Sequence, residues 1–212
     1  MPHHSRPTRS FAIVAVAAIA LLAGARVAAQ PPVKSFDVPL EWTPREVPAV
    51  PVVDLTGGLE RLRVVPLADA REDRTSIGDV TGRNTRVVTG TDVAAFVDQH
   101  LRRELASGGL DLVTEDADLT LTGELTQFWI DDGETYTGTV RVRLRLTNRE
   151  GAEVWAALAT GRGENWGRRM RRLNYTETIT SAILDLASNV LTNAQFMNAI
   201  RKVPTGTTRP GG

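Results

Sequence analysis

The chain has no cysteine among its 212 residues. Disulfide bonds, thiolate metal sites and cysteine nucleophiles are therefore excluded. A bacterial lipid anchor is not expected either, because that modification requires a cysteine at the point where the export signal is cleaved. The fold must depend on packing, hydrogen bonds and ion pairs, and we expect a protein that is not lipid-anchored.

Histidine is scarce, and only His100 lies beyond the first 29 residues. A catalytic histidine needs a nucleophile or a carboxylate partner, and no motif supplies one, so His100 is expected to be an ordinary surface or boundary residue. The acidic run 69–74 lacks the spacing of an EF-hand loop, and the glycines of 161–167 lack the dinucleotide-binding spacing. We predict no catalytic residue, no metal site and no cofactor, and do not expect an enzyme.

The chain also lacks an excess of either charge, with 25 basic and 25 acidic residues. Three of the arginines, Arg6, Arg9 and Arg26, lie in the first 29 residues, which contain no acid. The remaining chain is therefore slightly acidic. Proteins that bind nucleic acid usually carry a strong basic excess, so nucleic acid is not an expected partner.

Only one long hydrophobic run is present, at residues 11–25. Basic residues precede this run and Val27-Ala28-Ala29 follows it, which is the pattern of an export signal cleaved before Gln30. The run is short for a membrane span, although an uncleaved membrane anchor is the alternative. We predict a signal peptide over 1–29, a periplasmic location and no transmembrane span after cleavage.

Proline is concentrated in residues 30–57, where six prolines occur. Proline at this density blocks helices and favours extended backbone, so this lead-in is expected to be a semi-rigid spacer or, alternatively, a partner-binding arm. A single domain is predicted over 58–200. The polar tail 201–212 is predicted to be disordered.

The domain is organised around residues 118–163, where apolar and polar side chains alternate in three successive segments. An alternation of period two is typical of β-strands with one buried face, so we predict a three-strand meander. In the third strand, Val154, Ala156 and Leu158 are expected to belong to the apolar face. That face requires a cover.

Two amphipathic helices can supply this cover. One is predicted from Thr91 or Asp92 to about Ser107, and the other is predicted to begin at a capping box formed by Asn174 and Glu177. Shorter strands are expected near 62–67 and 86–88, separated by a polar loop over 69–83. The predicted fold class is α+β, a two-layer sandwich whose mostly antiparallel sheet contains the meander and is covered by two helices.

Arginines are dense just before the second predicted helix. Guanidinium groups suit phosphate and carboxylate partners, whereas positive charge is unfavourable at a helix N-terminus, so a purely stabilising role is not evident. A solvated or acid-paired loop is the alternative. The candidate binding residues of this segment are Arg162, Trp166, Arg168, Arg169, Arg171 and Arg172.

A second candidate surface lies on the middle strand of the meander, where Arg141, Arg143 and Arg145 share one face. The favoured alternative is cross-strand pairing of these arginines with Glu124 and neighbouring threonines, which stabilises an open sheet face by about 0.2–1 kcal/mol per pair. Trp129, Trp155 and Tyr136 could add an aromatic patch near this sheet.

A series of short motifs carries a family resemblance. In chain order they are Val64-Val65-Pro66, Asp69-Ala70-Arg71, Ile77-Gly78, the helix 93–105, Ala117-Asp118-Leu119, Tyr136-Thr137-Gly138, Val154-Trp155, Gly161 and the last amphipathic helix. Their order and spacing over residues 60–195 resemble the YajG-like family of uncharacterised bacterial envelope lipoproteins. The resemblance implies a small periplasmic α/β domain, akin to accessory domains of envelope assembly and transport systems, without known catalytic residues. The missing lipidation cysteine implies a soluble member.

These observations predict a periplasmic, non-enzymatic binding or assembly module of the bacterial envelope. The expected partner is an envelope protein or an anionic envelope component. An accessory factor that handles envelope lipid or glycan is one alternative, and an envelope hydrolase with an unrecognised site is another. The sequence does not indicate the oligomeric state.

Overall fold

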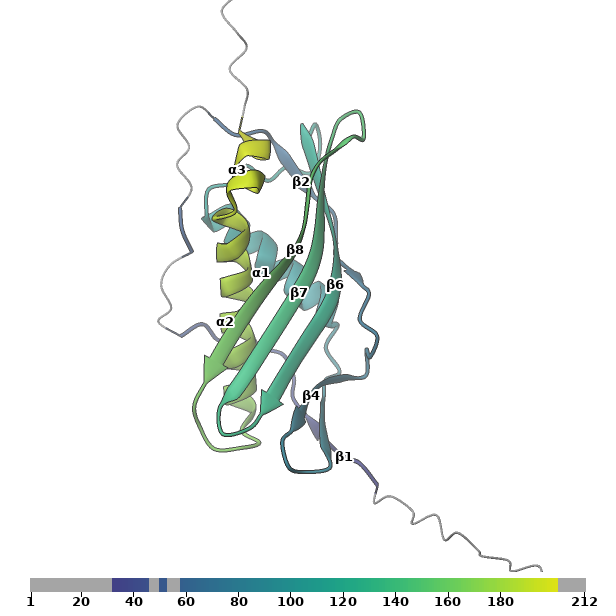
Figure 1. Ribbon diagram of the computed structural model, residues 1–212, viewed down its shortest axis with the longest axis vertical. Helices are drawn as coiled ribbons and strands as arrows, with labels where there is room; N and C mark the ends of the chain where they lie inside the picture. The colour runs from purple at the N-terminus through teal and green to yellow at the C-terminus, as the bar shows by residue number, and fades with distance from the viewer. Residues whose placement is uncertain (1–31, 46–49, 53–57, 202–212) are drawn as a thin grey trace, which may run out of the picture. The chain divides into compact units, whose positions relative to one another are not determined.

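The computed structural model describes residues 32–45, 50–52 and 58–201 (Figure 1). The predicted signal peptide, the tail from residue 202 and parts of the lead-in lie outside the described residues. The elements are β1 (Lys34–Asp37), β2 (Leu62–Val64), β3 (Ala68–Asp69), β4 (Ser76–Val80), β5 (Thr85–Val88), α1 (Val93–Ser107), β6 (Leu119–Asp132), β7 (Tyr136–Asn148), β8 (Glu153–Asn165), α2 (Arg172–Leu191) and α3 (Ala194–Ile200).

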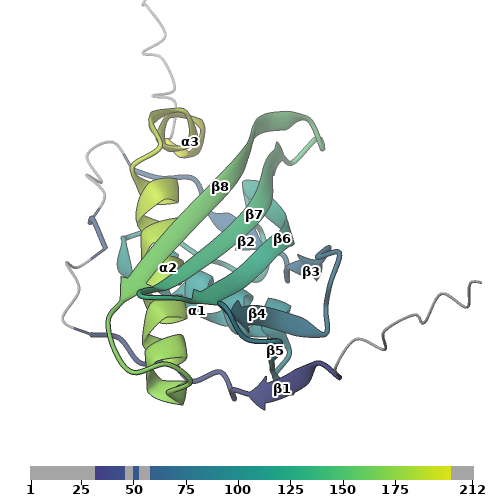
Figure 2. The same cartoon turned by 60° about the horizontal axis from the view of Figure 1, so that its bottom comes forward.

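The three long strands β6, β7 and β8 form the predicted antiparallel meander. The apolar side chains of β7 alternate with its arginines and are fully buried, so the alternation of period two identified both faces of this strand. Helices α1 and α2 lie on the same side of the sheet (Figures 1 and 2). The α+β fold with a helix-covered meander is therefore confirmed.

The orientation predicted for the third strand of the meander is wrong. Val154 and Leu158 are exposed on the open face, whereas Trp155 is buried and its ring lies 4.9 Å from that of Phe196 in α3. The register explains this orientation, because Trp155 pairs with the buried Leu146 of β7. The covered face of β8 is thus made of Trp155 followed by alanines and glycines.

These small residues allow α2 to lie directly against the strand. A β-carbon added at Gly161 would lie 2.0 Å from the carbonyl oxygen of Ala182, and one added at Gly163 would lie 2.1 Å from that of Thr178. Real atoms do not approach so closely, so glycine is required at both positions. The glycines therefore serve helix packing, and no phosphate-binding loop is needed to explain them.

The remaining strands complete a mixed sheet with the order β1-β5-β4-β6-β7-β8. Strands β2, β3 and β4 pair in succession with the other edge of β6, all of them in parallel. Antiparallel pairing predominates because β6, β7 and β8 are long. The polar loop expected over 69–83 is interrupted by β4, whose Ile77 and Val80 are buried.

The helix ends agree only in part with the predicted caps. The Asp92 side chain accepts a hydrogen bond from the Ala95 N–H of α1 at 2.9 Å, as expected for an N-cap. By contrast, α2 begins at Arg172, so Asn174 lies inside its first turn and does not cap it. The Asn174 amide instead donates to the Arg168 carbonyl at 3.1 Å. Among the described residues, no helix is both long and apolar enough to cross a bilayer.

Part of the proline-rich lead-in is packed on the domain. Strand β1 pairs in parallel with β5, and Val38 and Leu40 are buried. The Trp42 ring stacks on His100 of α1, with centroids 4.0 Å apart. Residues 34–42 of the described lead-in therefore belong to the folded unit.

Candidate functional site

The end of β8, the connection to α2 and the first residue of α2 hold most of the predicted binding residues, and we call residues 162–172 the arginine segment. Its backbone is anchored by Tyr136 of β7, whose hydroxyl donates to the Arg168 carbonyl at 2.6 Å and accepts from the Arg171 N–H at 3.3 Å. Burial raises the pKa of Tyr136, so this hydroxyl stays protonated at neutral pH. The exposed segment is therefore held by a buried side chain.

Asp132, at the end of β6, is the second anchor. Its carboxylate is fully buried and accepts from the Met170 N–H at 2.8 Å and from the Tyr175 hydroxyl at 2.5 Å. Met170 has a φ of 57°, which is unusual for a residue other than glycine. Burial and the Asp132 carboxylate raise the pKa of Tyr175. These contacts fix the path of the segment before α2 begins.

The arginines of the segment divide into two groups. Arg169 donates to the Gly133 carbonyl at 3.1 Å and to the Thr81 carbonyl at 3.2 Å, and Arg172 donates to the Asp37 carbonyl at 3.0 Å. These two guanidinium groups tie the segment to β-turns and to β1. Within the described residues, the guanidinium groups of Arg162, Arg168 and Arg171 have no hydrogen bond or ion pair.

Large apolar side chains accompany the unpaired arginines. Trp166 is 74% exposed and Leu173 is 45% exposed, although a buried tryptophan or leucine would contribute to stability. The segment and the first turn of α2 thus present Arg168, Arg171, Trp166 and Leu173 to solvent from a fixed backbone. Guanidinium groups beside exposed apolar side chains suit a partner that is both anionic and amphipathic.

On the second predicted surface, the open face of β7, two of the three arginines are paired with glutamates. Arg143 pairs with Glu124 at 2.7 Å and Arg145 pairs with Glu153 at 2.5 Å, so cross-strand pairing occupies both arginines. A shallow groove of about 580 Å³ runs beside these pairs. Arg141 on the same face has no side-chain partner among the described residues. This face therefore offers less uncompensated charge than the arginine segment.

The aromatic residues considered for the same sheet do not share a face. Trp129 is half-buried on the open face, where its Nε1–H donates to Asp131 at 3.1 Å. Tyr136 and Trp155 are buried on the covered face. The sheet therefore has no common patch of these three rings.

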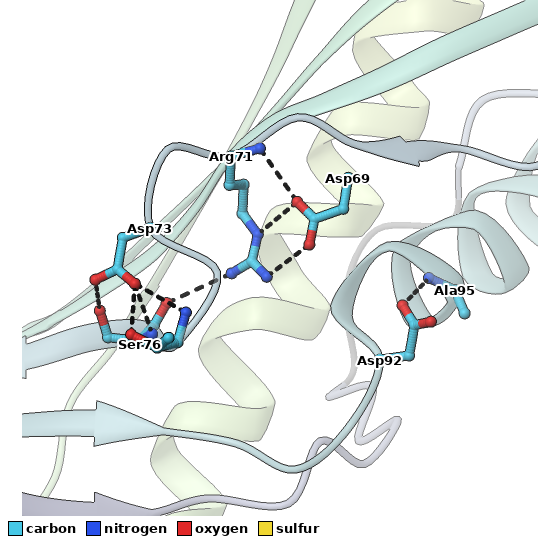
Figure 3. A network of polar contacts seen from close by, with 7 residues as sticks. Asp69, Arg71, Asp73, Ser76, Asp92 and Ala95 are labelled. Carbon is cyan, nitrogen blue, oxygen red and sulfur yellow. Dashed lines mark hydrogen bonds and ion pairs between the residues drawn. The ribbon is translucent and has the colours of Figure 1, made fainter.

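In the acidic run 69–74, the carboxylates of Asp69 and Asp73 accept hydrogen bonds from neighbouring residues (Figure 3). Arg71 is buried and donates to both oxygens of Asp69, and it lowers the pKa of that carboxyl. Asp73 accepts from the hydroxyls of Thr75 and Ser76, which also lower its pKa. In residues 32–45, 50–52 and 58–201, no cluster of three or more potential ligands is arranged for a metal ion.

His100 is buried rather than a surface residue. It is enclosed by Trp42 and by Phe96, whose ring centroid lies 4.6 Å away, and its Nδ1 has no hydrogen-bond partner. Burial, and then the nearby Arg103, lower its pKa from 6.5 to about 4. The neutral His100 ring therefore packs between the lead-in and α1, through its stacking on Trp42.

This environment predicts a pH dependence of stability. The unfolded chain binds a proton at His100 below pH 6.5, whereas the folded chain does so only near pH 4, so the free energy of unfolding should fall as the pH falls from 6.5 to 4. The loss attributable to His100 is at most about 3.5 kcal/mol, since one pKa unit corresponds to about 1.4 kcal/mol. Urea unfolding of the protein and of His100→Phe across this range measures it. Equal slopes for the two proteins would contradict the prediction.

Sequence reasoning identified the arginines but missed the residues that position them. The sequence indicated no anchoring role for Asp132 or Tyr175. The available signal was the isolated tyrosine in an otherwise aliphatic helix stripe, because a buried tyrosine hydroxyl usually has a polar partner.

The family model described as "LptE: Lipopolysaccharide-assembly" matches residues 76–203, and no curated protein matches. A solved structure of protein XCC0632 from Xanthomonas campestris is 12% identical and has a TM-score of 0.50, with 78% of this chain and 96% of that chain covered. The PelC dodecamer from Paraburkholderia phytofirmans is 19% identical with a TM-score of 0.41, covering 67% and 94%.

Proposed function

Because this chain belongs to the LptE family of lipopolysaccharide-assembly proteins, we propose that it is a non-enzymatic envelope module that binds lipopolysaccharide through its arginine segment. Lipopolysaccharide carries phosphate groups next to acyl chains, so a suitable binding surface combines guanidinium groups with exposed apolar side chains. The arginine segment and the adjoining turn of α2 have this combination in Arg168, Arg171, Trp166 and Leu173.

Family membership supports an envelope-associated assembly or binding role. The matching model is LptE, and the finer resemblance to the YajG-like family remains a hypothesis. A periplasmic location without a lipid anchor and the lack of enzymatic activity also remain predictions from the sequence. The proposal combines the binding-module hypothesis with the alternative of a factor that handles envelope lipid.

The observation that carries the proposal is the lack of protein partners for two exposed guanidinium groups on a fixed backbone. Arg168 and Arg171 have no acidic or carbonyl partner for their side chains among the described residues, whereas Arg143 and Arg145 are already paired with glutamates. Binding of phosphate by Arg168 or Arg171 therefore does not require an existing ion pair to break. Tyr136 and Asp132 hold the backbone in place, which lowers the entropy lost on binding.

The test compares Arg168→Ala/Arg171→Ala with the matched control Arg143→Ala/Arg145→Ala, which removes the same number of charges. Binding of each purified protein to lipopolysaccharide is measured by calorimetry at several salt concentrations. The first double variant should bind about 30-fold more weakly, because a charge-assisted hydrogen bond contributes on the order of 1 kcal/mol or more. The control should bind within about twofold of the unmodified protein.

Two further measurements separate a loss of phosphate recognition from a loss of folding. Dephosphorylated lipopolysaccharide should bind the unmodified protein as weakly as intact lipopolysaccharide binds the Arg168→Ala/Arg171→Ala protein. Thermal unfolding should show that both double variants are folded. Unchanged lipopolysaccharide affinity of a folded Arg168→Ala/Arg171→Ala protein would refute this binding site.

A further inference from the structure

The two outer strands of the sheet differ in how their edges are protected. Strand β1 forms one edge and β8 forms the other (Figure 2). The short strand β1 carries Lys34 and Asp37, and Pro39 follows it. Charged residues, proline and short length are the usual means by which an edge strand avoids pairing with another chain. Strand β8 is 13 residues long and has no proline or lysine.

One half of the β8 edge is covered by α2. The Asp185 carboxylate accepts from the Arg162 N–H at 2.9 Å, and the Asn189 amide donates to the Thr160 carbonyl at 2.9 Å. Since backbone groups of alternate residues point to the same side of a strand, the N–H and C=O groups of Ala156 and Leu158 also point away from β7. Within the described residues, these groups have no hydrogen-bond partner.

The uncovered half also carries exposed apolar side chains. Val154 is 43% exposed and Leu158 is 57% exposed, and Ala156 between them is exposed as well. These side chains lie on the open face of the sheet, opposite α2. An unpaired edge with apolar side chains is a template for strand addition.

We propose that the segment 154–158 of β8 pairs with the same segment of a second copy of this chain in an antiparallel, two-fold symmetric arrangement. A register centred on Ala156 places each Val154 opposite a Leu158 of the other copy. The edge is thus self-complementary in hydrogen bonds and apolar contacts.

The two-fold axis of such a pair passes perpendicular to the sheet. The two sheets join into one, and their open faces lie on the same side. Pairing ends at Thr160, where Asn189 already occupies the edge. The interface is small, so the dimer should be weak and concentration-dependent. This inference does not depend on lipopolysaccharide binding.

Sedimentation equilibrium of the purified protein tests the association. We expect a reversible monomer–dimer equilibrium, and Leu158→Lys should weaken it by about tenfold or more because a charge is then placed against Val154 of the other copy. Leu173→Lys introduces the same change at an exposed leucine of α2 and should leave the equilibrium unchanged. A monomer at all accessible concentrations, or equal association of the protein and the Leu158→Lys variant, would overturn the proposal.

Cysteine cross-linking tests the register, and the absence of native cysteine makes it specific. Residues paired across an antiparallel ladder have Cα atoms about 5.5 Å apart, within disulfide range. Ala156→Cys should therefore form a disulfide dimer under mild oxidation. Leu158→Cys should not, since its two copies are separated by about 14 Å along the strands. A mixture of the Val154→Cys and Leu158→Cys proteins should form a mixed disulfide dimer. The proposed register would be refuted if Leu158→Cys alone formed a disulfide dimer efficiently and Ala156→Cys did not.

Discussion

Replacing Gly161 by alanine is expected to lower the free energy of unfolding by about 4 kcal/mol or more. The new β-carbon would lie 2.0 Å from the Ala182 carbonyl oxygen and 2.5 Å from the Leu186 backbone nitrogen. Ordinary overpacking costs about 1–3 kcal/mol, because side chains rotate away. Here the obstructing atoms belong to the backbone of α2, so the whole helix must move away from β8. Urea unfolding followed by circular dichroism measures the change.

Gly90→Ala is the matched control for this substitution. A β-carbon at Gly90 has no heavy atom within 4 Å, so its effect should stay within about 0.5 kcal/mol. Gly163→Ala should resemble Gly161→Ala, since its β-carbon would lie 2.1 Å from the Thr178 carbonyl oxygen. If Gly161→Ala were as stable as Gly90→Ala, the direct contact between β8 and α2 would be refuted.

The role of these glycines shows what the sequence could predict about the meander. In β7, arginines alternate with valines and leucines, so the buried face was unambiguous. In β8, both alternating sets are apolar or small, and the set of Val154 and Leu158 was predicted to be the buried one. Helix α2 instead packs against the set with alanines and glycines, because these small residues let the helix backbone approach the strand closely. Periodicity locates a strand, but it cannot rank two apolar faces without knowledge of what covers them.

The short elements were less predictable for a related reason. Strands β2, β3 and β4 are held in place by β6, which lies far away in sequence, and β1 is held by β5. Strands of two to five residues have too few positions for a periodic pattern. Helix α2 began two residues before the predicted cap because tertiary contacts with Tyr136 and Asp132 set the chain path there.

The candidate site was predictable in composition and not in arrangement. The density of arginines was evident in the sequence, as was the nearby tryptophan. The pairing of each arginine could not be predicted, because the carbonyl groups that accept from Arg169 and Arg172 come from three distant segments. They belong to Thr81, Gly133 and Asp37. Arg169 and Arg172 donate to these carbonyls, so the binding site that we propose centres on Arg168 and Arg171.

Asp132→Ala is expected to destabilise the protein by about 3 kcal/mol or more, which is the usual cost of leaving buried hydrogen-bond donors without an acceptor. The carboxylate is fully buried and is the acceptor for the Tyr175 hydroxyl and the Met170 N–H. Both donors would lose this partner, and Met170 would lose a contact that holds its left-handed backbone. The free energy of unfolding, measured with urea, gives the effect.

The neighbouring Asp131→Ala is the matched control, because Asp131 is exposed and its side chain accepts from the Trp129 ring. It should change stability by less than about 1 kcal/mol. Since Asp132 positions the backbone between Arg168 and Arg171, Asp132→Ala should also weaken lipopolysaccharide binding under conditions where the variant is still folded, and Asp131→Ala should not. Equal stabilities of the two variants would refute the anchoring role. A destabilised but folded Asp132→Ala protein with unchanged affinity would show that binding does not need a fixed arginine segment.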